Sequence, residues 1–87
     1  MKLETRAAYY KRGDFWKESK KDTITFYDMR EALERFKAQD PKYYINKKDI
    51  SIIETVTLIY KTDLGYKRYY KTIDPITEDI ETNYKED

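Results

Sequence analysis

Three tyrosine pairs limit what this chain can fold into. Tyr9-Tyr10, Tyr43-Tyr44 and Tyr69-Tyr70 each adjoin a basic residue. Successive side chains of a β-strand point to opposite faces, so a tyrosine pair on a strand places one ring on each face. One ring can enter a core, and the other then faces solvent or a partner. The sequence therefore predicts strands that carry aromatic rings on both faces.

Composition narrows the possible function classes. The 87 residues suffice for one domain with a small core, and the 16% aromatic content favours a folded chain despite 40% charged residues. The chain has no Cys and no His, which excludes disulfides, zinc sites and the commonest nucleophiles and bases. With only Gly13 and Gly65, it also cannot form a glycine-rich phosphate loop. We therefore expect a binding domain that is not an enzyme and that has no cofactor or metal.

Charge is unevenly distributed along the chain. The net charge is +1, but residues 1–71 carry 17 basic and 11 acidic side chains, whereas residues 72–87 carry one Lys and six acids. This asymmetry predicts a single domain over residues 1–75, followed over residues 76–87 by an acidic tail or a short docking helix. The charged N-terminus and the absence of a long apolar run predict a cytoplasmic protein without membrane contact.

The clearest predicted element is a helix over residues 26–39. Met29, Ala32, Leu33 and Phe36 follow the spacing of one apolar stripe along a helix. Two starts are compatible with the sequence, one with Asp28 as the N-cap and one with Thr25. The residue before a proline avoids the α region, so Asp40-Pro41 ends the helix.

The remaining predicted elements are strands. Residues 3–12 alternate as a strand does, and Gly13-Asp14 interrupts them. Residues 15–19 fit either a second strand or a loop anchored by aromatic side chains, and residues 23–26 fit a brief strand. Residues 42–49 read as a connection, and residues 50–61 as a strongly β-forming segment.

A three-residue hairpin loop with Gly65 in the left-handed conformation would follow this segment. The resulting register places Leu58 opposite Tyr70 and Ile59 opposite Tyr69. We therefore expect an α+β fold, with a three- to four-stranded antiparallel sheet and one amphipathic helix packed on one face, in the order β(β)αββ. A single helix can cover only one face, which leaves apolar groups on the other.

The residue types point to binding of another protein. Tyr, Trp and Arg dominate the energetics of protein interfaces because each combines a large area with a polar group. We expect the sheet to present a partner-binding surface that comprises Tyr10, Arg12, Trp16, Tyr66, Arg68, Tyr69, Tyr70 and Lys71. A second copy of the chain is an alternative partner, since small domains gain stability by association.

Two other functions remain open at this point. Tyr interleaved with Lys and Arg suits stacking of single-stranded nucleic acid, although a near-zero net charge and an acidic tail weaken that case. A bacterial structural or regulatory domain acting as a homodimer is also compatible. In general character the chain resembles small proteins of phages that infect low-GC bacteria. That resemblance implies a stoichiometric inhibitor of a host or defence protein, and it assigns no residue.

Overall fold

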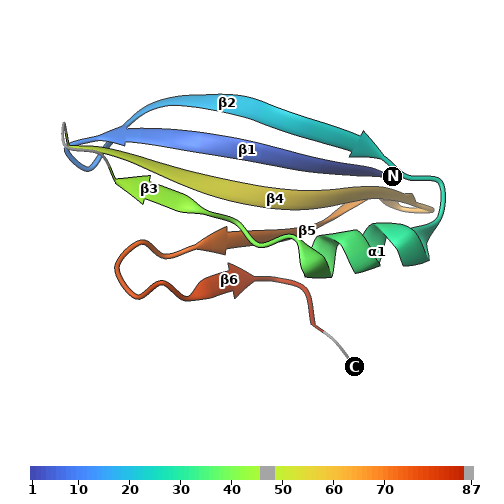
Figure 1. Cartoon of the computed structure of the whole chain (residues 1–87). Helices are drawn as coiled ribbons and strands as arrows, with labels where there is room; N and C mark the ends of the chain where they lie inside the picture. Colours follow the sequence, from blue (N-terminus) through green and yellow to red (C-terminus); the bar gives the residue numbers. More distant parts are fainter. Residues whose placement is uncertain (46–48, 86–87) are drawn as a thin grey trace.

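The computed structural model describes residues 1–45 and 49–85, and in that part the chain forms one antiparallel sheet and one helix (Figure 1). The strands are β1 (Lys2–Lys11), β2 (Asp14–Thr25), β3 (Tyr43–Ile45), β4 (Ile50–Thr62), β5 (Gly65–Ile73) and β6 (Ile80–Thr82), and the helix is α1 (Met29–Ala38). The order across the sheet is β2-β1-β4-β5-β6, and β3 pairs with the first residues of β4.

The predicted α+β class and the sheet of three or four strands are wrong, because the described fold is mostly β with six strands. Strands β3 and β6 raise the count beyond four, and β2 runs from Asp14 to Thr25, where the sequence predicted a strand or loop over residues 15–19 and a brief strand over residues 23–26. Most side chains of β2 are exposed. An exposed strand lacks the alternation of apolar residues by which strands are recognised. Strands β3 and β6 have three residues each, too few for any periodicity to be visible.

The predicted helix and its apolar stripe are confirmed. Helix α1 begins after Asp28, whose Oδ1 accepts a hydrogen bond from the backbone N–H of Arg30 at 2.9 Å. Ala32 and Phe36 are fully buried against the sheet. An aspartate in this position satisfies a backbone donor that the helix itself leaves unpaired.

The core lies between α1 and one face of the sheet, which we call the helix face. Leu3, Val56 and Leu58 supply its sheet side and are at most 1% exposed. Figure 1 shows α1 beside one half of the sheet, at the end opposite the β1–β2 turn. The end of the sheet that carries this turn, which we call the distal end, therefore has no helix over it.

The register of the β4–β5 hairpin differs from the prediction by one residue. Leu58 pairs with Tyr69, and Thr57 pairs with Tyr70. The difference arises because the turn contains two residues rather than three, so that Thr62 pairs directly with Gly65. Tyr69 consequently lies on the helix face, and Tyr70 on the opposite face, which we call the open face.

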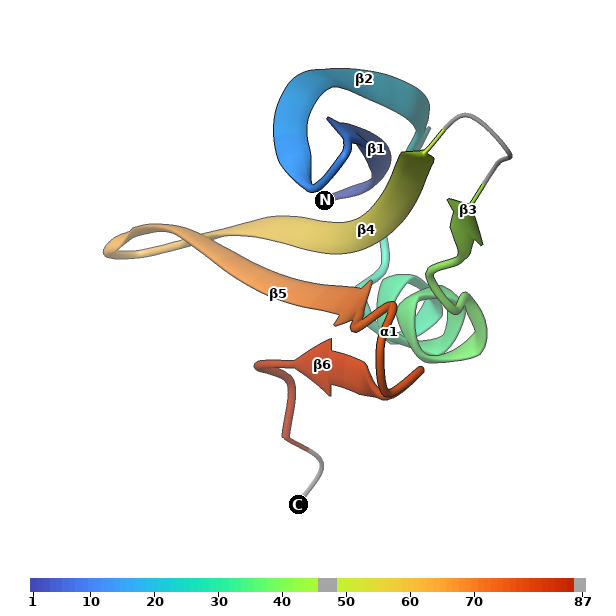
Figure 2. The same ribbon diagram turned by 90° about the vertical axis from the view of Figure 1, so that its left-hand side faces the viewer.

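The sheet is strongly curled around the β1–β2 hairpin (Figure 2). Two register shifts interrupt the pairing of β1 with β2, and they leave Lys21 and Trp16 as extra residues on β2. Extra residues of this kind bend a strand and increase its twist. The bulges therefore account for part of the curvature at the distal end.

The C-terminal segment joins the sheet. β6 pairs with the end of β5 at the position where the sequence predicted a tail or a docking helix. Tyr84 packs edge-on against Phe36 and Tyr69, with ring centroids 5.8 and 5.1 Å apart. An aromatic ring close to the end of the chain thus closes one side of the core.

Candidate protein-binding site

The predicted partner-binding residues fall into two groups at opposite ends of the sheet. Tyr10 pairs with Ser51 of β4, whereas Tyr70 pairs with Thr57, six positions farther along the same strand. At the rise of an extended strand the two tyrosines are therefore about 20 Å apart. Tyr10, Arg12 and Trp16 belong to the distal end, and Tyr66, Arg68 and Tyr70 lie on the open face of β5. The structure therefore gives two surfaces instead of one.

Tyr69 and Lys71, also in the predicted set, are engaged within the fold. Tyr69 packs against the core cluster on the helix face. The Lys71 side chain is only 12% exposed. Its Nζ donates a hydrogen bond to the backbone carbonyl of Lys37 at 2.8 Å and lies 5.1 Å from the centre of the Phe36 ring. A cation here stabilises the C-terminal turn of α1, whose carbonyl groups carry partial negative charge.

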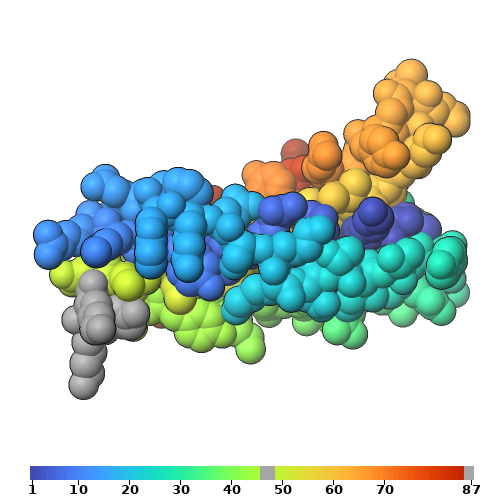
Figure 3. All heavy atoms as spheres, turned by 90° about the horizontal axis from the view of Figure 1, so that it is seen from above, coloured from blue at the N-terminus to red at the C-terminus, as the bar shows by residue number. Residues whose placement is uncertain are grey.

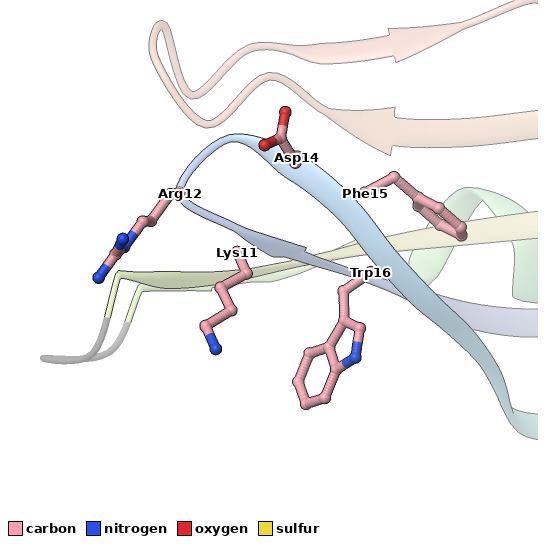
Figure 4. Close-up of a pocket in the computed structure, with 5 residues that line it drawn as sticks. All are labelled: Lys11, Arg12, Asp14, Phe15 and Trp16. Carbon is pink, nitrogen blue, oxygen red and sulfur yellow. The ribbon is translucent and has the colours of Figure 1, made fainter.

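The distal end carries four aromatic rings on one hairpin, which we call the aromatic tip: Tyr9, Tyr10, Phe15 and Trp16. Phe15 and Trp16 are 61% and 54% exposed. Phe15 pairs with Tyr10 and lies on the open face, whereas Trp16 lies beside Tyr9 and the helix face. In Figure 4, Trp16 points to the same side of the hairpin as Lys11, and Phe15 points in a different direction. The hairpin therefore presents large apolar groups on both faces.

Ring contacts fix the orientation of the exposed side chains. Trp16 meets Tyr9 edge-on at 6.5 Å, and Phe15 meets Tyr10 edge-on at 5.9 Å. Lys17 Nζ lies 4.9 Å from the centre of the Tyr9 ring and 4.7 Å from that of Trp16. Such cation–π contacts contribute about 0.5–1 kcal/mol each at exposed sites. Both exposed rings are thus held in place before any partner binds.

Backbone geometry explains why the rings gather here. Arg12 and Gly13 both have positive φ, at +52° and +86°, which produces the tight turn between β1 and β2. The backbone N–H of Arg12 donates to the carbonyl of Asp49 at 3.0 Å, which ties the turn to the residue just before β4. The extra residue at Trp16 brings Lys17 into register with Tyr9, so that the indole of Trp16 and the side chain of Lys17 both lie beside the Tyr9 ring.

β3 extends the apolar surface on both faces. Tyr44 and Tyr9 both pair with Ile52, so all three share the helix face. Ile45 and Tyr10 both pair with Ser51 and share the open face. The tyrosine pairs of β1 and β3 are therefore neighbours across β4.

One ion pair holds this end of the sheet together. Glu54 is 8% exposed, and its carboxylate accepts hydrogen bonds from Lys21 Nζ at 2.8 Å and from the backbone N–H of Lys42 at 3.1 Å. The hydrogen bond to Glu54 raises the pKa of Lys21, against the opposing effect of partial burial. Lys21 Nζ also lies 5.6 Å from the Tyr44 ring. Glu54 therefore fastens β2 and the segment before β3 to the centre of the sheet.

Sequence patterns had missed Lys17 and the joint placement of the first two tyrosine pairs. Lys17 follows Phe15-Trp16 directly, but its place between two rings depends on the bulge at Trp16. The tyrosine pairs themselves were the available signal. Their adjacency follows only from the pairing of β1 and β3 with β4, which connects residues far apart in the sequence.

The described residues show neither a metal cluster nor a helix that could span a membrane. Across residues 1–45 and 49–85, no group of three or more acidic side chains is placed to hold a metal ion. Within the same ranges, no helix has the length and apolar character needed to cross a bilayer. No protein-family model, curated protein or solved structure matches the chain. Function is therefore inferred from the chemistry of the chain's own residues.

Proposed function

We propose that this protein is a non-catalytic binding domain that inserts its aromatic tip into a cleft of another protein. The observation that carries this proposal is the exposure of Phe15 and Trp16 on different faces of one hairpin, beyond the part of the sheet that α1 covers. A flat docking surface needs apolar groups on one face only. Rings on two faces suit a hairpin that contacts both walls of a cleft.

The composition of the tip indicates the chemistry of the partner. Large aromatic side chains that are already oriented lose little conformational entropy on binding, which favours affinity. Lys11 and Arg12 flank the rings at the turn (Figure 4), and neither forms an ion pair in the described part of the chain. The expected partner therefore offers an apolar cleft with carboxylates at its rim. A domain that fills such a cleft would act as a stoichiometric inhibitor.

Affinity capture tests the proposal. The purified domain is immobilised and exposed to a lysate of the source cells, and Phe15→Ala and Trp16→Ala are compared with the wild-type chain. We expect a partner that the wild-type domain retains and that both variants lose. Tyr27→Ala is the matched control, because Tyr27 is 94% exposed and lies outside the tip. A partner that both tip variants retain as strongly as the control does would refute the assignment.

A second copy of the chain is the alternative occupant. Association through the tip would give a mass near twice 10.7 kDa in light scattering. Trp16→Ala would return that mass to the monomer value. A clean monomer at high concentration eliminates the homodimer and leaves a different protein as the partner. We further propose that the protein acts in the cytoplasm.

A further inference from the structure

The open face of β5 carries a second surface, remote from the aromatic tip, which we call the β5 platform: Tyr66, Arg68 and Tyr70. These alternate residues of one strand share one face. Tyr66 and Tyr70 are 70% and 41% exposed, with Arg68 between them. Neither tyrosine forms a ring contact with another aromatic residue within the described ranges. Two ring faces are therefore available to a ligand.

Two further cations lie next to the platform. Lys61 pairs with Tyr66, and Ile59 pairs with both Arg68 and Lys2, so Lys2 and Lys61 share the open face with the platform. None of Lys2, Lys61 and Arg68 forms an ion pair with a carboxylate in the part of the chain that the structure describes. This end of the open face therefore has uncompensated positive charge.

The neighbouring part of the same face is different. Glu4 accepts contacts from Arg6 at 3.4 Å and from Lys20 at 3.4 Å, and Arg6 also contacts Glu18 at 3.0 Å. Burial opposes ionisation of Glu4, but hydrogen bonds from Lys20 and Arg6 lower its pKa overall. The charges in the middle of the open face thus neutralise one another. An anionic ligand is attracted to the end beside the β5 platform and not to the middle.

The surface is hollowed at this point. A shallow depression of about 450 Å³ is lined by Lys2, Ile59, Lys61, Tyr66 and Arg68, together with Met1, Tyr60 and the paired carboxylate Glu4. The β4–β5 hairpin, yellow to orange in Figure 3, stands out from the rest of the molecule and forms one side of this region. The lining of the depression combines aliphatic Ile59, the Tyr66 ring and three cations, and its one carboxylate, Glu4, is already paired with Arg6 and Lys20. This combination suits a ligand that has flat rings and negative charges.

The backbone of the platform is fixed from its other edge. The side chain of Asn83 accepts a hydrogen bond from the N–H of Tyr70 at 2.8 Å and donates one to the carbonyl of Arg68 at 2.9 Å. Asn83 thereby continues the pairing of β6 with β5 by means of its side-chain amide. The spacing of the two tyrosines and the arginine is consequently set before a ligand binds.

We propose that the β5 platform binds single-stranded nucleic acid. Bases stack on Tyr66 and Tyr70, and phosphates lie near Arg68, Lys61 and Lys2. Stacking on an aromatic ring is available to every base, so the binding has little sequence preference. An acidic peptide would satisfy the cations but would leave both tyrosine faces without a flat partner. The site is separate from the aromatic tip and does not depend on the function proposed for the tip.

Fluorescence anisotropy with a labelled thymidine oligonucleotide tests this assignment. With three phosphates neutralised on a single strand, the affinity should fall roughly 20-fold between about 50 mM and about 200 mM salt. Arg68→Ala removes one of these contacts, so the same change in salt should then reduce the affinity only about sevenfold. Tyr66→Ala should weaken binding about fivefold or more at either salt concentration, because it removes one stacking ring.

Arg12→Ala is the matched control, because it removes the same charge at the other end of the sheet. We expect it to leave the affinity unchanged. Three outcomes would overturn the proposal. The first is no retention of the oligonucleotide at low salt, and the second is equal loss in Arg12→Ala and Arg68→Ala. The third is displacement of the oligonucleotide by polyglutamate as effectively as by unlabelled oligonucleotide, which would assign the platform to an acidic protein.

Discussion

The β4–β5 register makes the tyrosine pair of β5 a sensitive probe of the fold. Tyr69 lies on the helix face, where its ring centre is 5.5 Å from that of Tyr60 and 5.1 Å from that of Tyr84. Tyr70 lies on the open face beside Thr57. The two side chains are chemically identical and adjacent, so replacing each in turn isolates the effect of the face. Threonine is the replacement of choice, because it keeps the β propensity of the strand.

The structure sets the size of the expected difference. Truncating a buried aromatic residue costs about 3–5 kcal/mol, and each favourable ring pair adds about 0.5–1.5 kcal/mol beyond its buried area. Tyr69 is only partly buried but takes part in two ring pairs. We therefore expect Tyr69→Thr to lower the free energy of unfolding by about 3 kcal/mol. Tyr70→Thr should change it by about 0.5 kcal/mol, as for an ordinary surface substitution.

Urea unfolding monitored by circular dichroism provides the measurement. A loss of about 3 kcal/mol corresponds to a midpoint lower by about 2 M, for a slope of about 1.5 kcal/mol per molar urea. Tyr69→Phe is the control, since it retains both ring pairs. A hairpin with a three-residue loop would place Tyr70 on the helix face and reverse the order of the two variants. Equal losses, or a larger loss for Tyr70→Thr, would refute the register and the core built on it.

Two further predictions concern charged and ionisable groups. Glu54→Ala leaves Lys21 without its partner and the backbone N–H of Lys42 unpaired. It should therefore lower the free energy of unfolding, measured by urea denaturation, by about 2 kcal/mol. A loss under about 0.5 kcal/mol would show that the ion pair does not hold this end of the sheet together. Burial and a hydrogen bond to Tyr69 raise the pKa of Tyr60 from 10.0 to about 12, so folding favours its protonated form. This stabilisation is complete below about pH 10 and is lost as the pH rises through about 12. The melting temperature of the wild-type chain should therefore fall more steeply at alkaline pH than that of Tyr60→Phe. Parallel plots of melting temperature against pH would contradict the assignment.

The elements that were predictable from sequence are those with a strong local pattern. Helix α1 combines an apolar stripe from Met29 to Phe36 with an acidic cap at Asp28, and both features are visible in one short stretch of sequence. Strand β4 is rich in β-branched residues and has a partner on each side. Strand β2 has neither feature, because it lies at the sheet edge with most of its side chains in solvent. Backbone hydrogen bonds to β1 hold β2 in place, and these bonds do not depend on which side chains the strand carries.

The candidate sites were predictable in residue type but not in arrangement. The sequence indicated Trp16, Tyr10 and Arg68 as binding residues, yet their separation into two surfaces depends on how β1, β4 and β5 pair. One residue more or less in a hairpin loop exchanges the faces of every side chain beyond it. The loop at Asp63-Leu64 has two residues where the prediction had three, so the prediction placed Tyr69 and Tyr70 on the wrong faces relative to Leu58.

The bulges of β2 have a consequence for how copies of this protein behave together. Along the outer rim of β2, the extra residues at Trp16 and Lys21 divide the strand into short stretches, and only four residues lie between them. A strand from another molecule would need an even ladder of amide and carbonyl groups, and lysines beside both interruptions repel a like-charged copy. The β2 rim is therefore a poor template for edge-to-edge pairing with a strand of another copy, and the apolar rings of the tip lie beside an edge that does not invite sheet extension.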